Sequence, residues 1–388
     1  MGPDLSSVDP EGISRPYVSD YSVVSGQRSL KDRSKMIEQD DSDKGQMSIA
    51  KTPISTAFHG VWSMYYSETL SPLARYGQCS SYSDHYETLV IAYGRNMKGN
   101  YFNDCWSLNL RTLKWKCISK KALSPRTGCQ SIISNNKLVV FGGEFEGQYF
   151  SDLHTIDIFN GDVEMIKTSG KPPTGRVNPV IGFHSQKFFV WGGFNGQTPS
   201  EINILHLDSM VWTQITVPLL GRSAPSFANV DHMIYIHGAS RNQGILALDM
   251  NNNTIETIEV TGTEPPITTQ EGRMVKFDQY LMVFGGKGDF PYTHLFAYDL
   301  SRKWWFIFHV RPDGETLTIE DGEVIDIGLF MIPREHGFAS FYRYHTREIV
   351  YLMGSMEKDP PPVYVISIGA AIASLHHRND MLDMLNKA

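Results

Sequence analysis

The side chains in this chain that could do chemistry are spread along it and do not form the usual catalytic patterns. None of the thirteen histidines among the 388 residues falls in the H-x-x-x-H or H-E-x-x-H spacing of a zinc enzyme. The cysteines, at positions 79, 105, 117 and 129, include no C-x-x-C pair, so the usual zinc and redox signatures are absent. The chain also has no G-x-S-x-G nucleophile elbow, no Walker loop and no G-x-G-x-x-G. We therefore assign no catalytic residue, no metal ligand and no cofactor.

A second set of polar and aromatic residues is better suited to binding than to reaction. Each group follows an apolar stretch that ends in glycine, where we expect an exposed loop. The candidate partner-binding residues are Arg95, Asn96, Lys98, Glu144, Glu146, Asn195, Gln197, Arg241, Asn242, Lys287, Asp289 and Phe290. Arginine and aromatic side chains are enriched at the energetic centres of protein interfaces. We therefore expect these loops to bind an extended peptide or a loop of another protein.

The elements that must position these loops are six short apolar strands, each of which ends in glycine. The predicted strands are Leu89–Gly94, Leu138–Gly143, Phe188–Gly193, Met233–Gly238, Leu281–Gly286 and Ile349–Gly354. An arginine precedes each strand, and successive arginines are 46 to 61 residues apart: Arg75, Arg126, Arg176, Arg222, Arg273 and Arg334. Because the same residue types recur in every copy, we interpret these arginines and glycines as structural.

Two further strands complete each repeat. A strand that often ends in aspartate follows the glycines, as in Asp152–Asp157, and a bulky residue such as Trp115 or Trp212 then opens a final strand. One unit is therefore four short strands in roughly 50 residues, which is the pattern of a propeller blade. The order of arginine, paired glycines, aspartate-ended strand and tryptophan resembles the kelch repeat over about 310 of the 388 residues.

The resemblance to kelch-repeat proteins implies an all-β fold. We predict a six-bladed kelch-type β-propeller with four antiparallel strands in each blade. A ring of blades must close, because an open ring leaves exposed strand edges. The last repeat lacks a tryptophan strand, and residues Gly60–Tyr66, which include Trp62, have the character of that strand. We therefore predict that this N-terminal strand closes the ring by pairing with the last blade.

Three regions are predicted along the chain. Residues 1–52 hold ten serines and many charges without a sustained period, which is typical of a disordered tail. Residues 53–368 form the kelch propeller, and residues 369–388 form a short C-terminal helical segment. The last interval between arginines is the longest, and its extra residues, 311–327, are an acidic loop or hairpin.

Two functions fit this organisation. The first is a non-catalytic scaffold or adaptor that docks a protein or peptide partner on the propeller loop face, as the kelch resemblance implies. The alternative is a small-molecule enzyme with a site in the propeller channel, because some kelch-fold proteins are enzymes. A cluster of acidic or histidine side chains that face into the channel would favour this alternative.

Charge and hydropathy restrict the partners and the location. The formal net charge of −7 argues against a nucleic-acid or membrane partner, because both require a basic surface. No apolar run reaches the roughly 18 residues of a membrane helix. We also expect no obligatory metal. A cytoplasmic protein is the expectation, with the nucleus as the second location.

Overall fold

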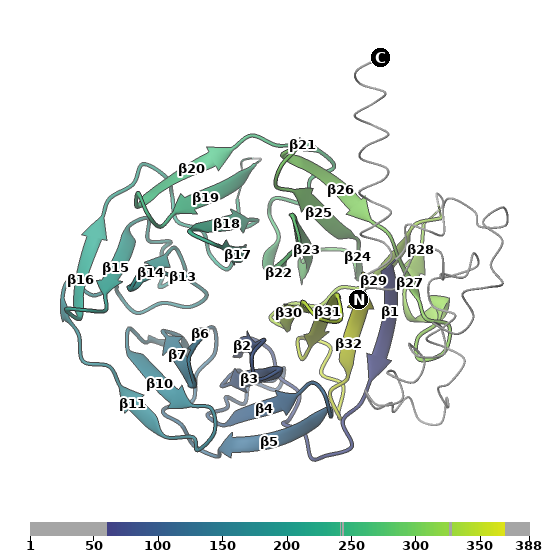
Figure 1. Ribbon diagram of the computed structural model, residues 1–388, viewed down its shortest axis with the longest axis horizontal. Helices are drawn as coiled ribbons and strands as arrows, with labels where there is room; N and C mark the ends of the chain where they lie inside the picture. The colour runs from purple at the N-terminus through teal and green to yellow at the C-terminus, as the bar shows by residue number, and fades with distance from the viewer. Residues whose placement is uncertain (1–59, 241, 243, 326–327, 369–388) are drawn as a thin grey trace.

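Six sheets of four or five strands circle a central channel in the computed structural model, which describes residues 60–240, 242, 244–325 and 328–368 (Figure 1). We number these sheets as blades 1 to 6. Their innermost strands are β2 (Cys79–Ser83), β6 (Gln130–Ser134), β13 (Val180–His184), β17 (Ser226–Val230), β22 (Gln270–Phe277) and β30 (Ala339–Arg343). The innermost strands of neighbouring blades contact one another, as β2 contacts both β6 and β30.

Blades 1, 2 and 4 are four-stranded antiparallel sheets. Outside β2, blade 1 contains β3 (Thr88–Ala92), β4 (Cys105–Asn109) and β5 (Lys114–Ser119). Blade 2 adds β7 (Lys137–Phe141), β10 (Leu153–Asp157) and β11 (Val163–Met165) to β6, and the small hairpin β8 (Glu144–Phe145) and β9 (Gln148–Tyr149) follows β7. Blade 4 adds β18 (Met233–His237), β19 (Ile245–Asp249) and β20 (Thr254–Ile258) to β17.

Blades 3, 5 and 6 carry a fifth strand that runs parallel to its neighbour. In blade 3, β14 (Lys187–Trp191), β15 (Ile202–His206) and β16 (Val211–Ile215) are followed by β12 (Ser169–Gly170). In blade 5, β23 (Tyr280–Lys287), β25 (Leu295–Asp299) and β26 (Trp304–Phe308) are followed by β21 (Thr261–Gly262). In blade 6, β31 (Glu348–Leu352), β32 (Val363–Ser367) and β1 (Gly60–Tyr65) are followed by β27 (Val310–Pro312).

A seventh, three-stranded sheet lies next to β27 (Figure 1). It contains β24 (Tyr292–Thr293), β28 (Glu323–Val324) and β29 (Phe330–Pro333), and the short 3-10 helix η6 (Ile319–Asp321) precedes β28. The prediction of six sheets with four antiparallel strands is therefore wrong in two respects. The described residues form seven sheets of three or more strands, and three blades have a parallel fifth strand. The physical reason is that the short segments β12, β21 and β27 pair with outer strand edges that would otherwise be exposed, and that β28 pairs with β29.

The core lies between the blades, because each middle strand is covered on both faces. Every residue of β31 and of β32 is buried. Near-continuous apolar runs are the pattern of strands covered on both faces, and the glycine-ended runs have this composition. The largest cluster joins blades 5 and 6 around Trp62 and Phe277. Large aromatic side chains bury much apolar surface there and hold neighbouring blades together.

The first described strand shares a sheet with the last one. β1 pairs antiparallel with β32, so that Trp62 lies opposite Ile366. The other edge of β1 pairs with β27. Trp62 is buried, and its Nε1 donates a hydrogen bond of 2.7 Å to the hydroxyl of Tyr351. β1 therefore supplies the tryptophan-bearing outer strand that the last repeat lacks in its own sequence.

A circle of backbone hydrogen bonds joins each blade to the next at the channel end where the glycine-ended strands finish. The donor amides are Gly94, Gly143, Gly193, Ala239, Gly286 and Gly354, and the acceptor carbonyls are Arg126, Arg176, Arg222, Thr269, Glu335 and Arg75, in that order, at 2.6–2.9 Å. The six bonds place equivalent residues of all blades in register. They also fix the start of each inner strand around the channel.

This register corrects the predicted repeat in blades 5 and 6. The arginine position is occupied by Thr269 in blade 5 and by Glu335 in blade 6, because these residues accept the interblade bond. Arg273 instead lies on the inner strand β22. Arg334 donates to the carbonyls of Phe290 (2.7 Å) and Tyr292 (3.1 Å), outside the circle. Arg273 and Arg334 lie within four residues of Thr269 and Glu335 in the sequence, so the spacing of the repeat alone predicted them for this position.

Candidate functional site at the channel mouth

Six equivalent residues form the rim of the channel at the end that carries the glycine-ended loops. We call them the mouth ring: Gly77, Gly128, Asn178, Ala224, Glu271 and Gly337. Each has a left-handed backbone, with φ between +46° and +70°. Backbone hydrogen bonds of 2.6–3.0 Å join five neighbouring pairs around the ring. Glycine takes this conformation without strain, whereas Glu271 takes it at a cost.

The mouth ring surrounds a cavity of about 150 Å³ to which all six blades contribute. Its lining includes the side chains of Tyr76, Gln78, Arg95, Thr127, Gln130, Glu144, Asn178, Glu271 and Arg273. The volume is large enough for several water molecules, since roughly 10–15 Å³ of accessible space suffices for one. It is well below the roughly 300 Å³ at which pockets for drug-sized ligands begin. The cavity therefore has the size of one side chain or one chain end.

Arg95 enters this cavity from the loop between β3 and β4. Its backbone pairs with that of Tyr76 through hydrogen bonds of 2.9 and 3.0 Å. The guanidinium carbon lies 5.2 Å from the Tyr76 ring centre and 5.9 Å from that of Tyr101. Burial opposes the charge, but the two phenols outweigh it and raise the pKa of Arg95. The Nε atom is buried and has no hydrogen-bond partner among the described residues.

Arg273 is a second guanidinium at the same cavity. It projects from β22, and its Nη1 donates to the carbonyl of the adjacent Gly272 at 3.3 Å. Burial lowers the pKa of Arg273 to about 10, although the charge of Glu271 acts in the opposite direction. The side chain is therefore still cationic at neutral pH. In the described part of the chain, neither Arg95 nor Arg273 has a carboxylate within ion-pair distance.

Glu271 is the acidic member of the mouth ring. Its carboxylate accepts hydrogen bonds from Lys287 Nζ at 2.6 Å and from His336 Nδ1 at 2.8 Å. Burial raises the pKa of Glu271, but the bonds from His336 and Lys287 outweigh burial and lower it to about 2. The His336 ring also packs edge-on against Tyr76, with 5.4 Å between ring centres. Glu271 is therefore ionised at all physiological pH values, with both oxygens engaged.

Residues that could hold a metal or act as a thiol nucleophile do not gather at this mouth. Within residues 60–368, leaving out the undescribed positions, no three His, Cys, Asp or Glu side chains are grouped as a metal site requires. Burial raises the pKa of the Cys79 and Cys105 thiols, which are therefore protonated and weak nucleophiles at neutral pH. No helix of that same part of the chain is long and apolar enough to cross a bilayer.

The structure brings some of the predicted residues to the cavity and leaves others around it. Arg95 and Glu144 line the cavity, and Lys287 reaches it through Glu271. Glu144 accepts a hydrogen bond of 2.6 Å from the hydroxyl of Tyr101. The following predicted residues lie on the surrounding loops and not in the lining: Asn96, Lys98, Glu146, Asn195, Gln197, Asn242, Asp289 and Phe290. Arg241 lies outside the described residues. That these residues contact a partner stays a prediction.

Sequence reasoning missed Tyr76, Asn178, Glu271 and His336, and it interpreted Arg273 as structural. All five lie within a few residues of the repeat position that accepts the interblade bond. A signal was available in blades 1 and 2, where a glycine stands two residues after the arginine. A recurrent Arg-x-Gly indicates a left-handed turn at the start of the inner strand, and side chains beside such a turn face the channel mouth.

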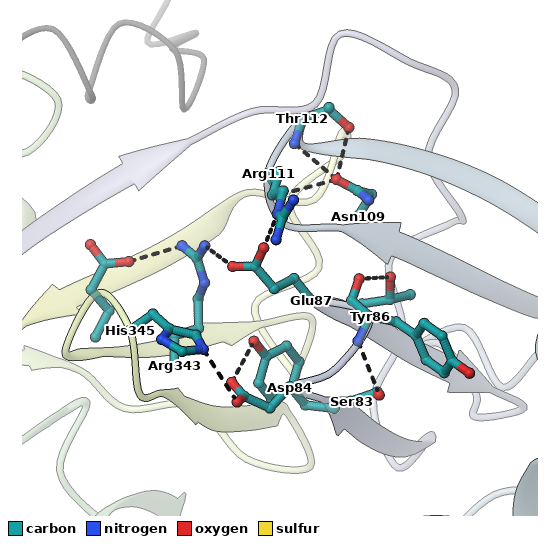
Figure 2. A network of polar contacts seen from close by, with 12 residues as sticks. Ser83, Asp84, Tyr86, Glu87, Asn109, Arg111, Thr112, Arg343 and His345 are labelled. Atoms are coloured by element: carbon teal, nitrogen blue, oxygen red, sulfur yellow. Dashed lines mark hydrogen bonds and ion pairs between the residues drawn. The ribbon is translucent and has the colours of Figure 1, made fainter. Parts of the chain in front are cut away.

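A polar network joins blades 6 and 1 where inner strand β30 ends, at Arg343 (Figure 2). Arg343 of β30 donates to Glu348 of β31 at 3.0 Å and to Glu87 of blade 1 at 3.3 Å. Arg111 also bonds to Glu87 (Figure 2). Burial raises the pKa of Glu87, but the two arginines outweigh it and lower the pKa. Because these charges pair with one another, we interpret the network as a tie between the last and first blades.

The comparisons with known proteins agree with this fold. A family model described as the KLHDC2/KLHL20/DRC7 Kelch-repeats domain matches residues 56–239. The chain is 28% identical over 158 residues to acyl-CoA-binding domain-containing protein 4 of Arabidopsis thaliana. This match covers 40% of this chain and 23% of that protein. It is 24% identical over 180 residues to Kelch domain-containing protein 10 of Homo sapiens, which covers 42% of this chain and 41% of that protein.

A third relative is tip elongation aberrant protein 3 of Schizosaccharomyces pombe, which is 24% identical over 147 residues. That match covers 29% of this chain and 13% of the relative. In these three curated relatives the chain therefore spans less than half of the length of the protein that it matches.

Proposed function

We propose, for a chain that belongs to the kelch-repeat β-propellers, that the channel mouth binds a protein or peptide partner. In this proposal the protein is a non-catalytic scaffold or adaptor. The partner lies across the loop face and places a carboxylate between Arg95 and Arg273. The six loops around the mouth contact the rest of the partner.

The observation that carries this proposal is the pair of guanidiniums without a carboxylate partner. Arginine binds carboxylates through two parallel hydrogen bonds, and such charge-assisted bonds are stronger than neutral ones. The buried Nε of Arg95 lacks a hydrogen bond among the described residues, and leaving such a donor unpaired is unfavourable. A carboxylate in the cavity satisfies this donor and the free charge of Arg273 together.

The loops around the mouth supply contacts for the remainder of a partner. Phe290 is 75% exposed and Met97 is 60% exposed. Exposed aromatic and methionine side chains beside charged loops are typical of surfaces that bind proteins. A cavity for one charged group within a wide polar rim fits an extended segment better than a small free ligand.

Charge reversal at the mouth tests this proposal. We expect Arg95→Glu and Arg273→Glu each to weaken partner binding at least tenfold, because each variant places a negative charge where the carboxylate binds. The measurement is affinity capture with quantitative mass spectrometry from native cells. Lys114→Glu is the matched control, because Lys114 is exposed on the outer strand of blade 1. Capture of the same proteins by all three variants and the wild type would contradict the proposal.

One observation favours a second candidate, a small-molecule enzyme with a site in the channel. Glu271 and His336 form an acid–histidine pair at the mouth, which is the feature that an enzyme requires for proton transfer. The lowered pKa of Glu271 makes its carboxylate a weak base, which disfavours this role. Turnover of a metabolite mixture that is lost in Glu271→Gln, with protein capture unchanged, would support the enzyme over the scaffold.

A further inference from the structure

The arginine position of the repeat holds a glutamate in blade 6. In blades 1 to 4 the arginine Nη1 donates to the backbone carbonyl just before the interblade donor: Arg75 to Tyr93, Arg126 to Gly142, Arg176 to Gly192 and Arg222 to Gly238, at 3.1–3.2 Å. In blade 6 the equivalent carbonyl belongs to Met353, because the amide of Gly354 makes the interblade bond. An ionised carboxylate cannot donate to a carbonyl, whereas a protonated one can.

The carboxyl of Glu335 is buried without a cation to balance it. The residue is 6% exposed, and its Oε2 accepts a long hydrogen bond of 3.4 Å from the amide of Met356. It packs so closely on Gly354 that a Cβ there would lie 2.2 Å from Oε2. No Lys, Arg or His of the described residues lies within ion-pair distance of it.

The other charged or titratable groups around Glu335 are already engaged or uncharged. Lys358 directs its Nζ to the hydroxyl of Tyr364 at 2.9 Å. Glu357 lines the same small cavity and accepts a bond from the amide of Met97. Tyr351 of β31 and Tyr364 of β32 face Glu335, and burial holds the pKa of both phenols above the ordinary value. The phenols are therefore neutral at physiological pH, and among the described residues neither hydroxyl is hydrogen-bonded to Glu335.

The segment that packs against Glu335 is hydrogen-bonded to residues beside the candidate site. We call residues 354–362 the blade 6 loop. Its Gly354 amide donates to the Arg75 carbonyl at 2.8 Å, and its Glu357 carboxylate accepts from the Met97 amide. Arg75 precedes Tyr76, and Met97 follows Arg95 by two residues. The loop therefore holds both ends of the Tyr76–Arg95 pair that lines the mouth.

We propose that Glu335 is a proton-dependent latch that fastens the blade 6 loop to blade 1 and so sets the shape of the mouth. Protonated Glu335 donates its O–H to the backbone carbonyl of Met353, which directly precedes this loop, as the arginines do to the equivalent carbonyls in blades 1 to 4. When Glu335 loses its proton, the donor is lost and a buried charge is left with only the long bond from the Met356 amide, so the loop is released. This inference rests on the proposed function in one respect, because the latch regulates the same site.

The direction of the pH effect follows from the burial of Glu335. Burial raises the pKa of Glu335 from 4.5 to about 7, and the Met356 amide and the Lys358 charge oppose this less strongly. The folded protein therefore keeps a proton that the unfolded chain releases above pH 4.5. The stabilisation is fully present below that pH and is lost as the pH rises through about 7.

Hydrogen exchange of the full-length protein, without any partner, tests the latch. The measurement is mass-spectrometric exchange of residues 353–362 between pH 5.5 and 8.0, corrected for the intrinsic pH dependence of exchange, with the blade 3 loop 193–200 as internal reference. We expect protection of the blade 6 loop to fall about fivefold or more relative to the reference in the wild type. Glu335→Gln keeps an N–H donor and should show no such fall. Glu256→Gln, on the outer strand of blade 4, should behave as the wild type.

Two results would overturn the latch. One is a wild-type blade 6 loop whose protection does not change with pH, and the other is a parallel change in Glu335→Gln. If Glu335→Gln does not fold, the wild-type profile decides alone, since only a midpoint near pH 7 supports the latch. Failure of the proposed function is distinguishable, because capture by Arg95→Glu reports on the partner while exchange reports on the loop without one.

Discussion

Glu271 and Glu335 lie close to the same channel mouth, yet the pKa values of their carboxyl groups are shifted in opposite directions. The pKa of Glu271 is lowered to about 2, and that of Glu335 is raised to about 7. Burial is the largest cause for both and raises both. The difference is the set of partners: Glu271 has two side-chain donors, Lys287 at 2.6 Å and His336 at 2.8 Å, whereas Glu335 has one backbone amide at 3.4 Å. The hydrogen-bonding partners of these two carboxyl groups, and not their burial, therefore decide which of them is ionised at neutral pH.

The repeat arginines show the same contrast with the opposite charge. Arg126 has a carboxylate partner, Asp152, at 2.7 Å, and Arg75 has Asp104. Arg176 and Arg222 make the same bond to a carbonyl but have no such partner among the described residues. Burial lowers the pKa of both of these arginines to about 10. They are charged at neutral pH, but their hydrogen bonds go to neutral acceptors, and Glu201 and Glu264 act on them only as charges beyond ion-pair distance.

The largest expected effect comes from removing an arginine that has a partner. Arg126→Met leaves Asp152 without the cation that balances its charge, and we expect a loss of about 3 kcal/mol in the free energy of unfolding. Arg176→Met removes only hydrogen bonds to neutral acceptors, and we expect a loss of about 1 kcal/mol. Urea unfolding at neutral pH measures both. Equal losses would contradict this comparison, because a carboxylate partner would then not change how much an arginine contributes to stability.

A smaller effect is expected from removing one partner of Glu271. Lys287 is half exposed, so Lys287→Met should cost about 1 kcal/mol at neutral pH. Glu271 contributes stability that is present above pH 4.5 and is lost as the pH falls towards about 2. In the variant this loss should begin at a higher pH. The free energy of unfolding between pH 2 and 6 measures it, and an unchanged acid profile would show that Lys287 does not hold the pKa down.

The smallest effect is expected from an ion pair on the outer surface of the propeller. Lys137 and Glu164 form an ion pair of 2.8 Å on the outer part of blade 2, with both side chains exposed. Water and salt screen such a pair, so Lys137→Met should leave the unfolding temperature within the error of the measurement. A loss of stability as large as that of Lys287→Met would mean that this exposed pair stabilises the propeller as much as the half-buried pair of Lys287 and Glu271.

The strands could be predicted because their apolar runs follow from burial on both faces. Leu138–Gly143, for example, corresponds to β7 and the turn that follows it. The register of blades 5 and 6 could not be predicted, because Thr269 and Glu335 do not resemble the arginine that they replace. Backbone bonds alone show the equivalence, and a carbonyl accepts such a bond whatever its side chain is.

The candidate site was less accessible to sequence reasoning than the strands. Arg95 and Glu144 could be found because they directly follow glycine-ended strands. Glu271 could not, because its partners stand 16 and 65 residues further along the chain and meet it only in the folded protein. A residue with a left-handed backbone at Glu271 also departs from the glycine that such a turn favours.

The pairing of β1 with β32 has a mechanical consequence. The two strands are antiparallel, and Val61 lies opposite Ser367, so the described chain enters and leaves the ring at the same end of one ladder. A pull applied through both chain ends therefore loads the ladder bonds one after another, as when a zipper is opened, and does not shear them all together. We therefore expect tension to separate β1 from β32 first, and the hydrogen bond from Gly354 to Arg75 then remains to hold blade 6 to blade 1.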